Sequence, residues 1–133
     1  MAAHTLAPAG SVVLAADDAP ALAGFYGALL EQDPAPGFGP SHWLLTLPGG
    51  APLEIYTPSA SRPRPRQPGR LALCLRRIGA GPVLEEWIAA AIARGATLQE
   101  PARSELFGLE AWLADPEGNA LLLLVTPALA DSP

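Results

Sequence analysis

The sequence GSVVLAA at residues 10–16 aligns with GRLALCL at residues 69–75, and the two segments stand 69 − 10 = 59 positions apart. A second pair of matching segments lies further along, because YTP ends at residue 58 and VTP ends at residue 127, an offset of 127 − 58 = 69. The second copy therefore carries about ten more residues in its loops. The sequence predicts an internal repeat, and we expect its two copies to share one fold.

Each copy is predicted to run strand, helix and then further strands. In the first copy, an apolar strand at residues 11–16 precedes two aspartates, which can cap a helix that opens near Pro20. The segments HWLLTL and PLEIYT then flank Gly49 and Gly50, which is a hairpin signal. These elements predict an α+β fold of two tandem β-α-β-β-β modules. We expect a single domain over residues 1–133, with module 1 at about 10–58, a connector at 58–69 and module 2 at about 69–127.

The composition excludes several classes of function. The net charge is −5, which argues against nucleic-acid binding because such binding relies on a basic surface. All eight basic residues are arginine, so Schiff-base chemistry on a lysine is excluded. Half of the residues are hydrophobic and the mean hydropathy is +0.24, which suggests apolar surface hidden in an oligomer or a cavity. We expect a homodimer.

The sequence also bears on location and redox chemistry. Prolines and glycines interrupt every long uncharged run, so no membrane-spanning helix is predicted. No Lys or Arg precedes the short apolar patch near the N-terminus, which makes it a poor match to a secretory signal, and we expect a cytoplasmic protein. Cys74 is the single cysteine, which excludes an intramolecular disulfide, and we expect it to be a small buried hydrophobe.

The connector, PSASRPRPRQPG at residues 58–69, alternates proline with arginine. Alternating prolines favour an extended backbone with few hydrogen bonds, so we expect a semi-rigid spacer. An anion-binding segment or a ligand of SH3 type is the alternative.

Glu54 is the most informative charged residue, because it stands alone in the apolar strand APLEIYTP at residues 51–58. Its partner is a metal ion, a basic residue, a substrate or water at an exposed edge. A two-residue turn at Gly49–Gly50 places Leu45 opposite Glu54 and Trp43 opposite Tyr56. These four residues are then expected to line one wall of a small-molecule site, or else Trp43 and Tyr56 belong to the core or to a dimer interface. By the same alternation His42 is expected on the opposite face.

Two further motifs resemble a known group. DDAPALAGFYGALL at residues 17–30 and LADPEGNALLLL at residues 113–124 are similar to the opening and closing signatures of the vicinal oxygen chelate superfamily. That superfamily includes glyoxalase I, bleomycin-resistance proteins and extradiol dioxygenases. With the duplicated element order, the resemblance covers residues from about Ser11 to Thr126, and it implies that the modules form a curved mixed sheet around a cavity.

In metalloenzymes of this superfamily, four residues that face the cavity bind one divalent metal ion. Carried over to this chain, the four places fall at Ser11, Glu54, Arg70 and Leu122. Only Glu54 is a good ligand, because a hydroxyl binds a metal poorly, leucine has no donor atom and arginine repels a cation. The resemblance therefore implies a protein without a metal or other cofactor, and Arg70 is expected to form an ion pair with Glu54 instead.

Three functions follow as expectations. The first is metal-free binding of a small anionic or aromatic molecule by Trp43, Leu45, Glu54, Tyr56 and Arg70. The second is a lyase, isomerase or dioxygenase in which Glu54 acts as a base or a metal ligand. The third is a dimeric interaction module without catalysis.

Overall fold

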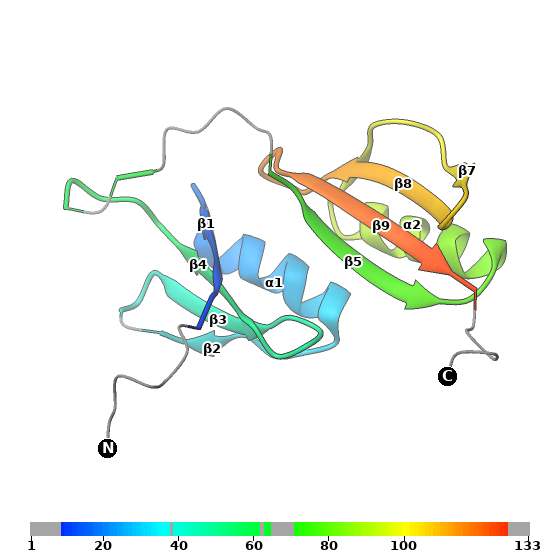
Figure 1. Cartoon of the computed structure of the whole chain (residues 1–133). Coiled ribbons are helices and arrows are strands. Elements are labelled where there is room, and N and C mark those ends of the chain that lie inside the picture. Colours follow the sequence, from blue (N-terminus) through cyan, green and yellow to red (C-terminus); the bar gives the residue numbers. More distant parts are fainter. Residues whose placement is uncertain (1–8, 38, 62, 65–70, 128–133) are drawn as a thin grey trace, which may run out of the picture. The chain divides into compact units, whose positions relative to one another are not determined.

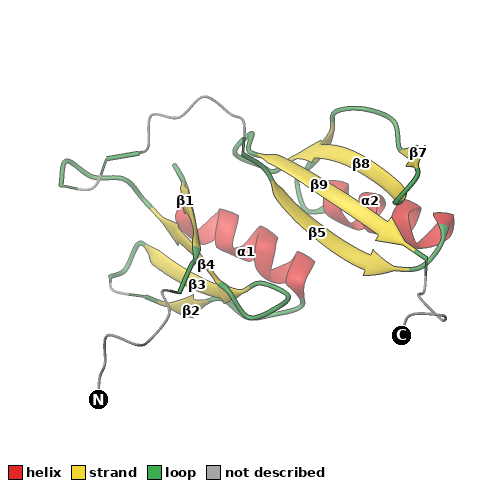
Figure 2. Cartoon of the chain, viewed as in Figure 1, coloured by secondary structure: helices red, strands yellow, loops and turns green. Residues whose placement is uncertain are grey.

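A computed structural model describes residues 9–37, 39–61, 63–64 and 71–127 of the chain. Its contacts divide the chain into two compact units, Met1–Pro65 and Arg66–Pro133, so the division falls inside the predicted connector. Each unit combines one long helix with a mixed sheet (Figures 1 and 2), which confirms the predicted α+β class and the repeated order of elements. No helix among the described residues has the length and apolar character needed to cross a membrane.

Unit 1 is a four-stranded sheet with one helix on one face. Its strands lie in the order β1-β4-β3-β2, with β1 parallel to β4 and the other pairs antiparallel. The elements are β1 (Val12–Ala15), α1 (Ala19–Leu30), β2 (Ala35–Pro36), β3 (His42–Thr46) and β4 (Pro52–Tyr56).

The helix α1 begins where the sequence predicts and packs through one apolar face. The Asp18 side chain accepts a hydrogen bond from the Ala21 N–H at 3.1 Å, which caps the first turn. Four residues of its apolar face are buried, Leu22, Phe25, Tyr26 and Leu29. The sheet residues Leu45, Leu53 and Ile55 are also buried, and they share the sheet face that meets α1.

Unit 2 repeats this arrangement with one additional short strand. Its strands lie in the order β5-β9-β8-β6, and β7 also pairs with β8. The elements are β5 (Leu73–Ile78), α2 (Gly81–Ala93), β6 (Thr97–Leu98), β7 (Arg103–Glu105), β8 (Gly108–Ala114) and β9 (Ala120–Thr126). The loop before β9 is closed by Asp115, whose carboxylate accepts hydrogen bonds from the Glu117 and Asn119 N–H groups and from the Asn119 side chain.

The turn between β3 and β4 differs from the predicted one. The Leu47 N–H donates to the Ala51 carbonyl at 2.7 Å, so the loop has three residues, Pro48, Gly49 and Gly50, rather than two. Both glycines have positive φ, 97° and 104°. The longer loop shifts the pairing by one residue, and a shift of one residue turns every side chain of one strand to the other face.

The two units can be matched through the bond that ends each parallel strand pair. The Ala16 N–H donates to the Tyr56 carbonyl in unit 1, and the Gly79 N–H donates to the Thr126 carbonyl in unit 2, each at 2.9 Å. The offsets are therefore 79 − 16 = 63 and 126 − 56 = 70, whereas the sequence alignment gave 59 and 69. The first offset taken from the sequence was therefore wrong by four residues. A slip by an even number of residues leaves the alternation of side chains between the two faces unchanged, so that alternation does not reveal the error.

Candidate functional site

The sheet face of unit 1 opposite α1 carries a hydrogen-bonded group centred on Glu54. The Ser11 hydroxyl donates to Glu54 Oε2 at 2.9 Å, and His42 Nε2 lies 3.0 Å from Glu54 Oε1. The side chain of Glu54 is 23% exposed and that of His42 is 7% exposed. Both oxygens of the carboxylate therefore have protein partners at the edge of solvent.

This arrangement corrects the predicted wall. In the observed register Glu54 lies opposite Leu44 and Tyr56 lies opposite His42, so His42 shares the face of Glu54. Trp43 lies opposite Ile55 and Leu45 opposite Leu53, on the face that meets α1. The prediction that Trp43 and Leu45 share a wall with Glu54 and Tyr56 is wrong, and so is the face assigned to His42.

Backbone geometry fixes the ring of His42. The Gly37 N–H donates to the His42 carbonyl at 2.6 Å, which brings the two residues side by side. A Cβ atom added to Gly37 would lie 2.1 Å from His42 Nδ1, so only glycine leaves room for the ring. If the three-residue turn had been recognised from the sequence, the strand register would have placed His42 rather than Trp43 on the face of Glu54.

His42 and Tyr56 also line a shallow pocket of about 420 Å³ at the end of β3 and β4. Four of its other lining residues carry hydroxyl groups, Ser41, Thr57, Ser59 and Ser61, and the remaining two are Gly39 and Pro40. The Tyr56 hydroxyl donates to the Pro63 carbonyl at 3.1 Å, which ties the following loop over the strand. The imidazole of His42 thus belongs both to this pocket and to the Glu54 group.

The corresponding face of unit 2 carries different polar residues. Cys74, Arg76 and Ile78 alternate along β5 on the side away from α2, and Arg76, Leu124 and Glu110 form one row across three strands. Glu110 is 5% exposed and accepts a hydrogen bond from Arg103 Nε at 3.2 Å. Cys74 is exposed, which corrects the expectation of a buried hydrophobe.

Arg103 is the centre of the charges in unit 2. Its guanidinium lies 3.0 Å from Glu105, 3.2 Å from Glu110 and 3.7 Å from Glu100. The hydrogen bond and the charge of Glu110 are the main causes that raise the pKa of Arg103, with the other two carboxylates adding to the effect. Arg103 therefore holds the buried carboxylate of β8 from the neighbouring short strand.

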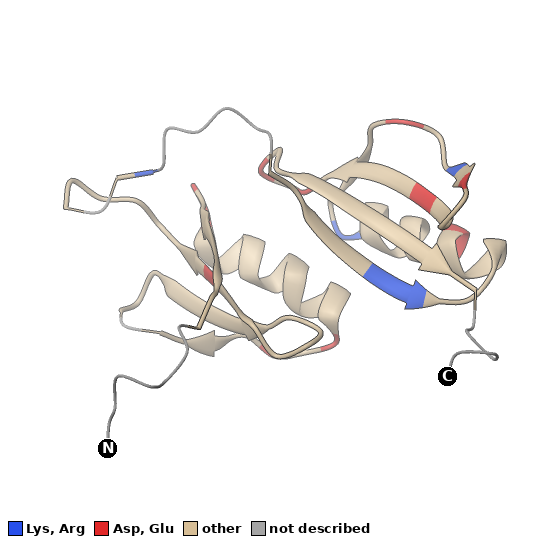
Figure 3. Cartoon of the chain, viewed as in Figure 1, with Lys and Arg blue, Asp and Glu red and all other residues tan. Residues whose placement is uncertain are grey.

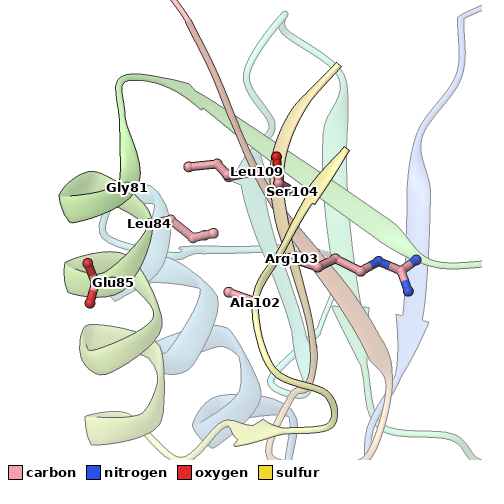
Figure 4. Close-up of a pocket in the computed structure, with 7 residues that line it drawn as sticks. All are labelled: Gly81, Leu84, Glu85, Ala102, Arg103, Ser104 and Leu109. Carbon is pink, nitrogen blue, oxygen red and sulfur yellow. The ribbon is translucent and has the colours of Figure 1, made fainter. Parts of the chain in front are cut away.

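Arg103 also borders a pocket of about 310 Å³ beside α2, which Figure 4 shows. Leu84 of α2 and Leu109 of β8 supply its apolar wall, while the guanidinium of Arg103 extends away from the helix. Among the described residues that line this pocket, only Glu85 and Arg103 have titratable side chains. The polar groups of the two sheet faces are the better candidates for function.

The residues at the family's ligand places do not fit a four-ligand metal site. Arg70 lies outside the described residues, and the hydrogen-bond register matches Ser11 with Cys74 and Glu54 with Leu124. The fourth place moves from Leu122 to Leu124 and is still a leucine, which has no donor atom. Although Cys74 is exposed at the surface, partial burial of its thiol is the largest effect and raises its pKa, which favours the protonated form.

Within the described ranges, no three histidine, cysteine, aspartate or glutamate side chains form a group that could hold a metal ion. The two oxygens of Glu54 already accept hydrogen bonds from side chains of their own unit. We derive no chemical step through a metal.

Comparisons with known proteins agree with this fold. Protein ATC0852 from Agrobacterium tumefaciens is 24% identical, with 92% of this chain and 100% of that one covered and a TM-score of 0.74. A glyoxalase-related enzyme from Fulvimarina pelagi is 22% identical, with 96% of each chain covered and a TM-score of 0.72. A glyoxalase/bleomycin resistance protein from Albidiferax ferrireducens T118 is 25% identical, with 88% and 97% covered and a TM-score of 0.67.

The comparison with protein families is the decisive one. A search of curated proteins found no match. The family model of the glyoxalase-like domain, however, matches residues 11–124. This range begins at Ser11, which bonds Glu54, and ends at Leu124, which corresponds to Glu54 in unit 2. This chain therefore belongs to the glyoxalase-like domain family, within the vicinal oxygen chelate superfamily.

Proposed function

We propose that this chain is a metal-free member of its family that binds a small anionic or aromatic molecule on the sheet face of unit 1 opposite α1. The observation that carries the proposal is the group of Ser11, His42 and Glu54. At the place where metalloenzymes of the family use a carboxylate to bind a cation, Glu54 is bonded to a hydroxyl and an imidazole. Such a group can orient a ligand by hydrogen bonds without a metal.

The pocket beside His42 supports binding of a small molecule. Its volume of about 420 Å³ lies within the range of ligand pockets, and its hydroxyl groups can donate and accept hydrogen bonds. Tyr56 supplies an aromatic ring at the same place. Arg70 and its ion pair with Glu54 remain predictions, because Arg70 lies outside the described residues.

The proposal is tested by a thermal-shift screen of small anions, aromatic acids and neutral aromatic molecules, carried out with and without a chelator. We expect a ligand that raises the melting temperature equally in both conditions and that loses this effect in Glu54→Gln. Thr46→Ser, on the same strand face but outside the group, serves as the control. Elemental analysis that finds one divalent ion per chain, lost in Glu54→Gln, would overturn the proposal.

A catalytic role is the second candidate, because His42 bonds the carboxylate that a lyase or isomerase would use as its base. In that role Glu54 takes a proton from the carbon next to a carbonyl group, and His42 holds its orientation. Exchange of that hydrogen in a small ketone for solvent deuterium, dependent on Glu54, would favour the enzyme over the binding protein. A dimeric interaction module remains the third alternative, and we expect sedimentation to give a homodimer.

A further inference from the structure

Two successive arginines of β5 serve opposite faces of the sheet of unit 2. The guanidinium of Arg77 lies 4.9 Å from the centre of the Trp87 ring, on the side of α2. Because side chains alternate along a strand, Arg76 lies on the other face together with Cys74. Figure 3 shows this basic pair on β5.

The charge of Arg76 is not neutralised within its own row. The side chain is exposed, and it takes part in no ion pair with any residue that the structure describes. The carboxylate of the same row, Glu110, is two strands away and is already bonded to Arg103. Arg76 therefore presents a cation to whatever contacts this face.

Apolar side chains surround this cation. Cys74, Leu122 and Trp112 form the next row of the ladder, and Leu124 stands beside Arg76 itself. Partial burial is the largest influence on the pKa of the Cys74 thiol and raises it, while the charge of Arg76 lowers it and that of Glu110 raises it. A single guanidinium on an apolar, partly aromatic wall suits an oxyanion attached to a flat or apolar body.

We propose that this face of unit 2 binds a small carboxylate or similar oxyanion, with Arg76 on the anionic group and Leu122 and Trp112 against its planar body. This inference goes beyond the proposed function, because it gives unit 2 a binding site of its own. The sequence assigned this role to Arg70 at the first position of the repeat. The observed register places Cys74 at that position and Arg76 two residues further along the same face.

The test uses two probes of equal shape, benzoate and its uncharged counterpart benzamide, titrated into the full chain and followed by NMR. We expect benzoate to shift the signals of Leu122 and the Trp112 indole more strongly than benzamide. Arg76→Gln should weaken benzoate binding by about tenfold or more. Arg94→Gln removes the same charge at the end of α2 and should leave binding unchanged.

Cys74 provides an independent readout, since it is the single cysteine of the chain. Benzoate should slow its alkylation by iodoacetamide in the wild type but not in Arg76→Gln. Equal binding of benzoate by Arg76→Gln and wild type, no preference over benzamide, or no binding of benzoate overturns the inference. The proposed function fails on separate grounds, either because the wider ligand screen, including neutral molecules, finds nothing or because a divalent ion is bound through Glu54.

Discussion

The two units hold a carboxylate in the same row of the same fold, but on different strands and with different partners. In unit 1 the row reads Val13, Glu54 and Leu44, and in unit 2 it reads Arg76, Leu124 and Glu110. Glu54 is held by a hydroxyl and an imidazole, whereas Glu110 is held by the permanent cation of Arg103. The two units therefore share the same strand pairing, but their polar residues stand at different positions of that pairing.

The largest expected effect concerns Gly108, with which β8 begins, whereas β3 of unit 1 begins with His42. A Cβ on Gly108 would lie 2.4 Å from the Val125 carbonyl oxygen, at a φ of 147°. Gly108→Ala should lower the free energy of unfolding by about 3 kcal/mol in urea denaturation.

Gly118→Ala is the control for this substitution. Gly118 also has a positive φ, 89°, but a Cβ there would meet nothing within 4 Å. We expect a loss of about 1 kcal/mol, the cost of the backbone conformation alone. Equal losses in the two variants would mean that the contact with Val125 plays no part.

The second effect separates the two ways of holding a carboxylate. Arg103→Gln should destabilise the chain, because it leaves Glu110 buried without its cation, and adding Glu110→Gln should restore most of the loss. Urea denaturation of the two single variants and the double variant measures this coupling. Additive effects would show that the pair is not coupled.

The matching substitution in unit 1 sharpens the comparison. His42→Gln should have a smaller effect on stability than Arg103→Gln, because Glu54 is more exposed than Glu110 and keeps its bond to Ser11. A larger loss in His42→Gln would reverse the ranking of the two groups.

The third effect tests how His42 is positioned. Gly37→Ala places a methyl group 2.1 Å from His42 Nδ1, so the ring must move away from Glu54, at a cost of about 1–3 kcal/mol. The ring signals of His42 in NMR should change, and they should not change in Gly39→Ala, where a Cβ would meet nothing within 4 Å. Unchanged ring signals in Gly37→Ala would contradict the proposed packing.

The smallest effect concerns the helices, since α1 contains Gly24 and Gly27 where the middle of α2 is rich in alanine. A Cβ on Gly24 would meet nothing within 4 Å, so Gly24→Ala should stabilise the chain by about 0.5–1 kcal/mol. Gly27→Ala should destabilise it, because that Cβ would lie 2.7 Å from the Gln32 carbonyl oxygen. Thermal unfolding distinguishes the signs, and two changes of the same sign would contradict the packing at the end of α1.

The sequence was sufficient for the elements but not for the site. The capping aspartate before α1, the repeat and the closing loop at Asp115 are local signals, and each predicted its element correctly. The faces of β3 and β4 depend on the length of one turn, and Gly49–Gly50 with Pro48 fits a loop of two or three residues equally well.

The wrong equivalence of Arg70 with Ser11 has a related cause. An offset of 59 matches VVLAA at residues 12–16 with the apolar LALCL at residues 71–75. The observed offset of 63 instead matches Val13 and Leu14 with Arg76 and Arg77, so apolar similarity favoured the wrong register. Only the hydrogen bonds at the ends of the parallel strands identify Cys74 as the counterpart of Ser11. Glu54 itself was identified from the sequence because it is a lone charge in an apolar strand, and this signal does not depend on the strand register.

The three-residue turn between β3 and β4 also makes unit 1 sensitive to a single genetic event. Loss of one codon among Pro48, Gly49 and Gly50 would keep the pairing if a two-residue turn formed between Leu47 and Ala51. If the loop kept three residues by taking in Leu47 or Ala51, the pairing would move by one position. His42 would then change places with Trp43, so that an indole rather than an imidazole stood beside Glu54. In lineages that carry this repeat, changes in loop length could therefore alter the chemistry of the face without any substitution in the strands.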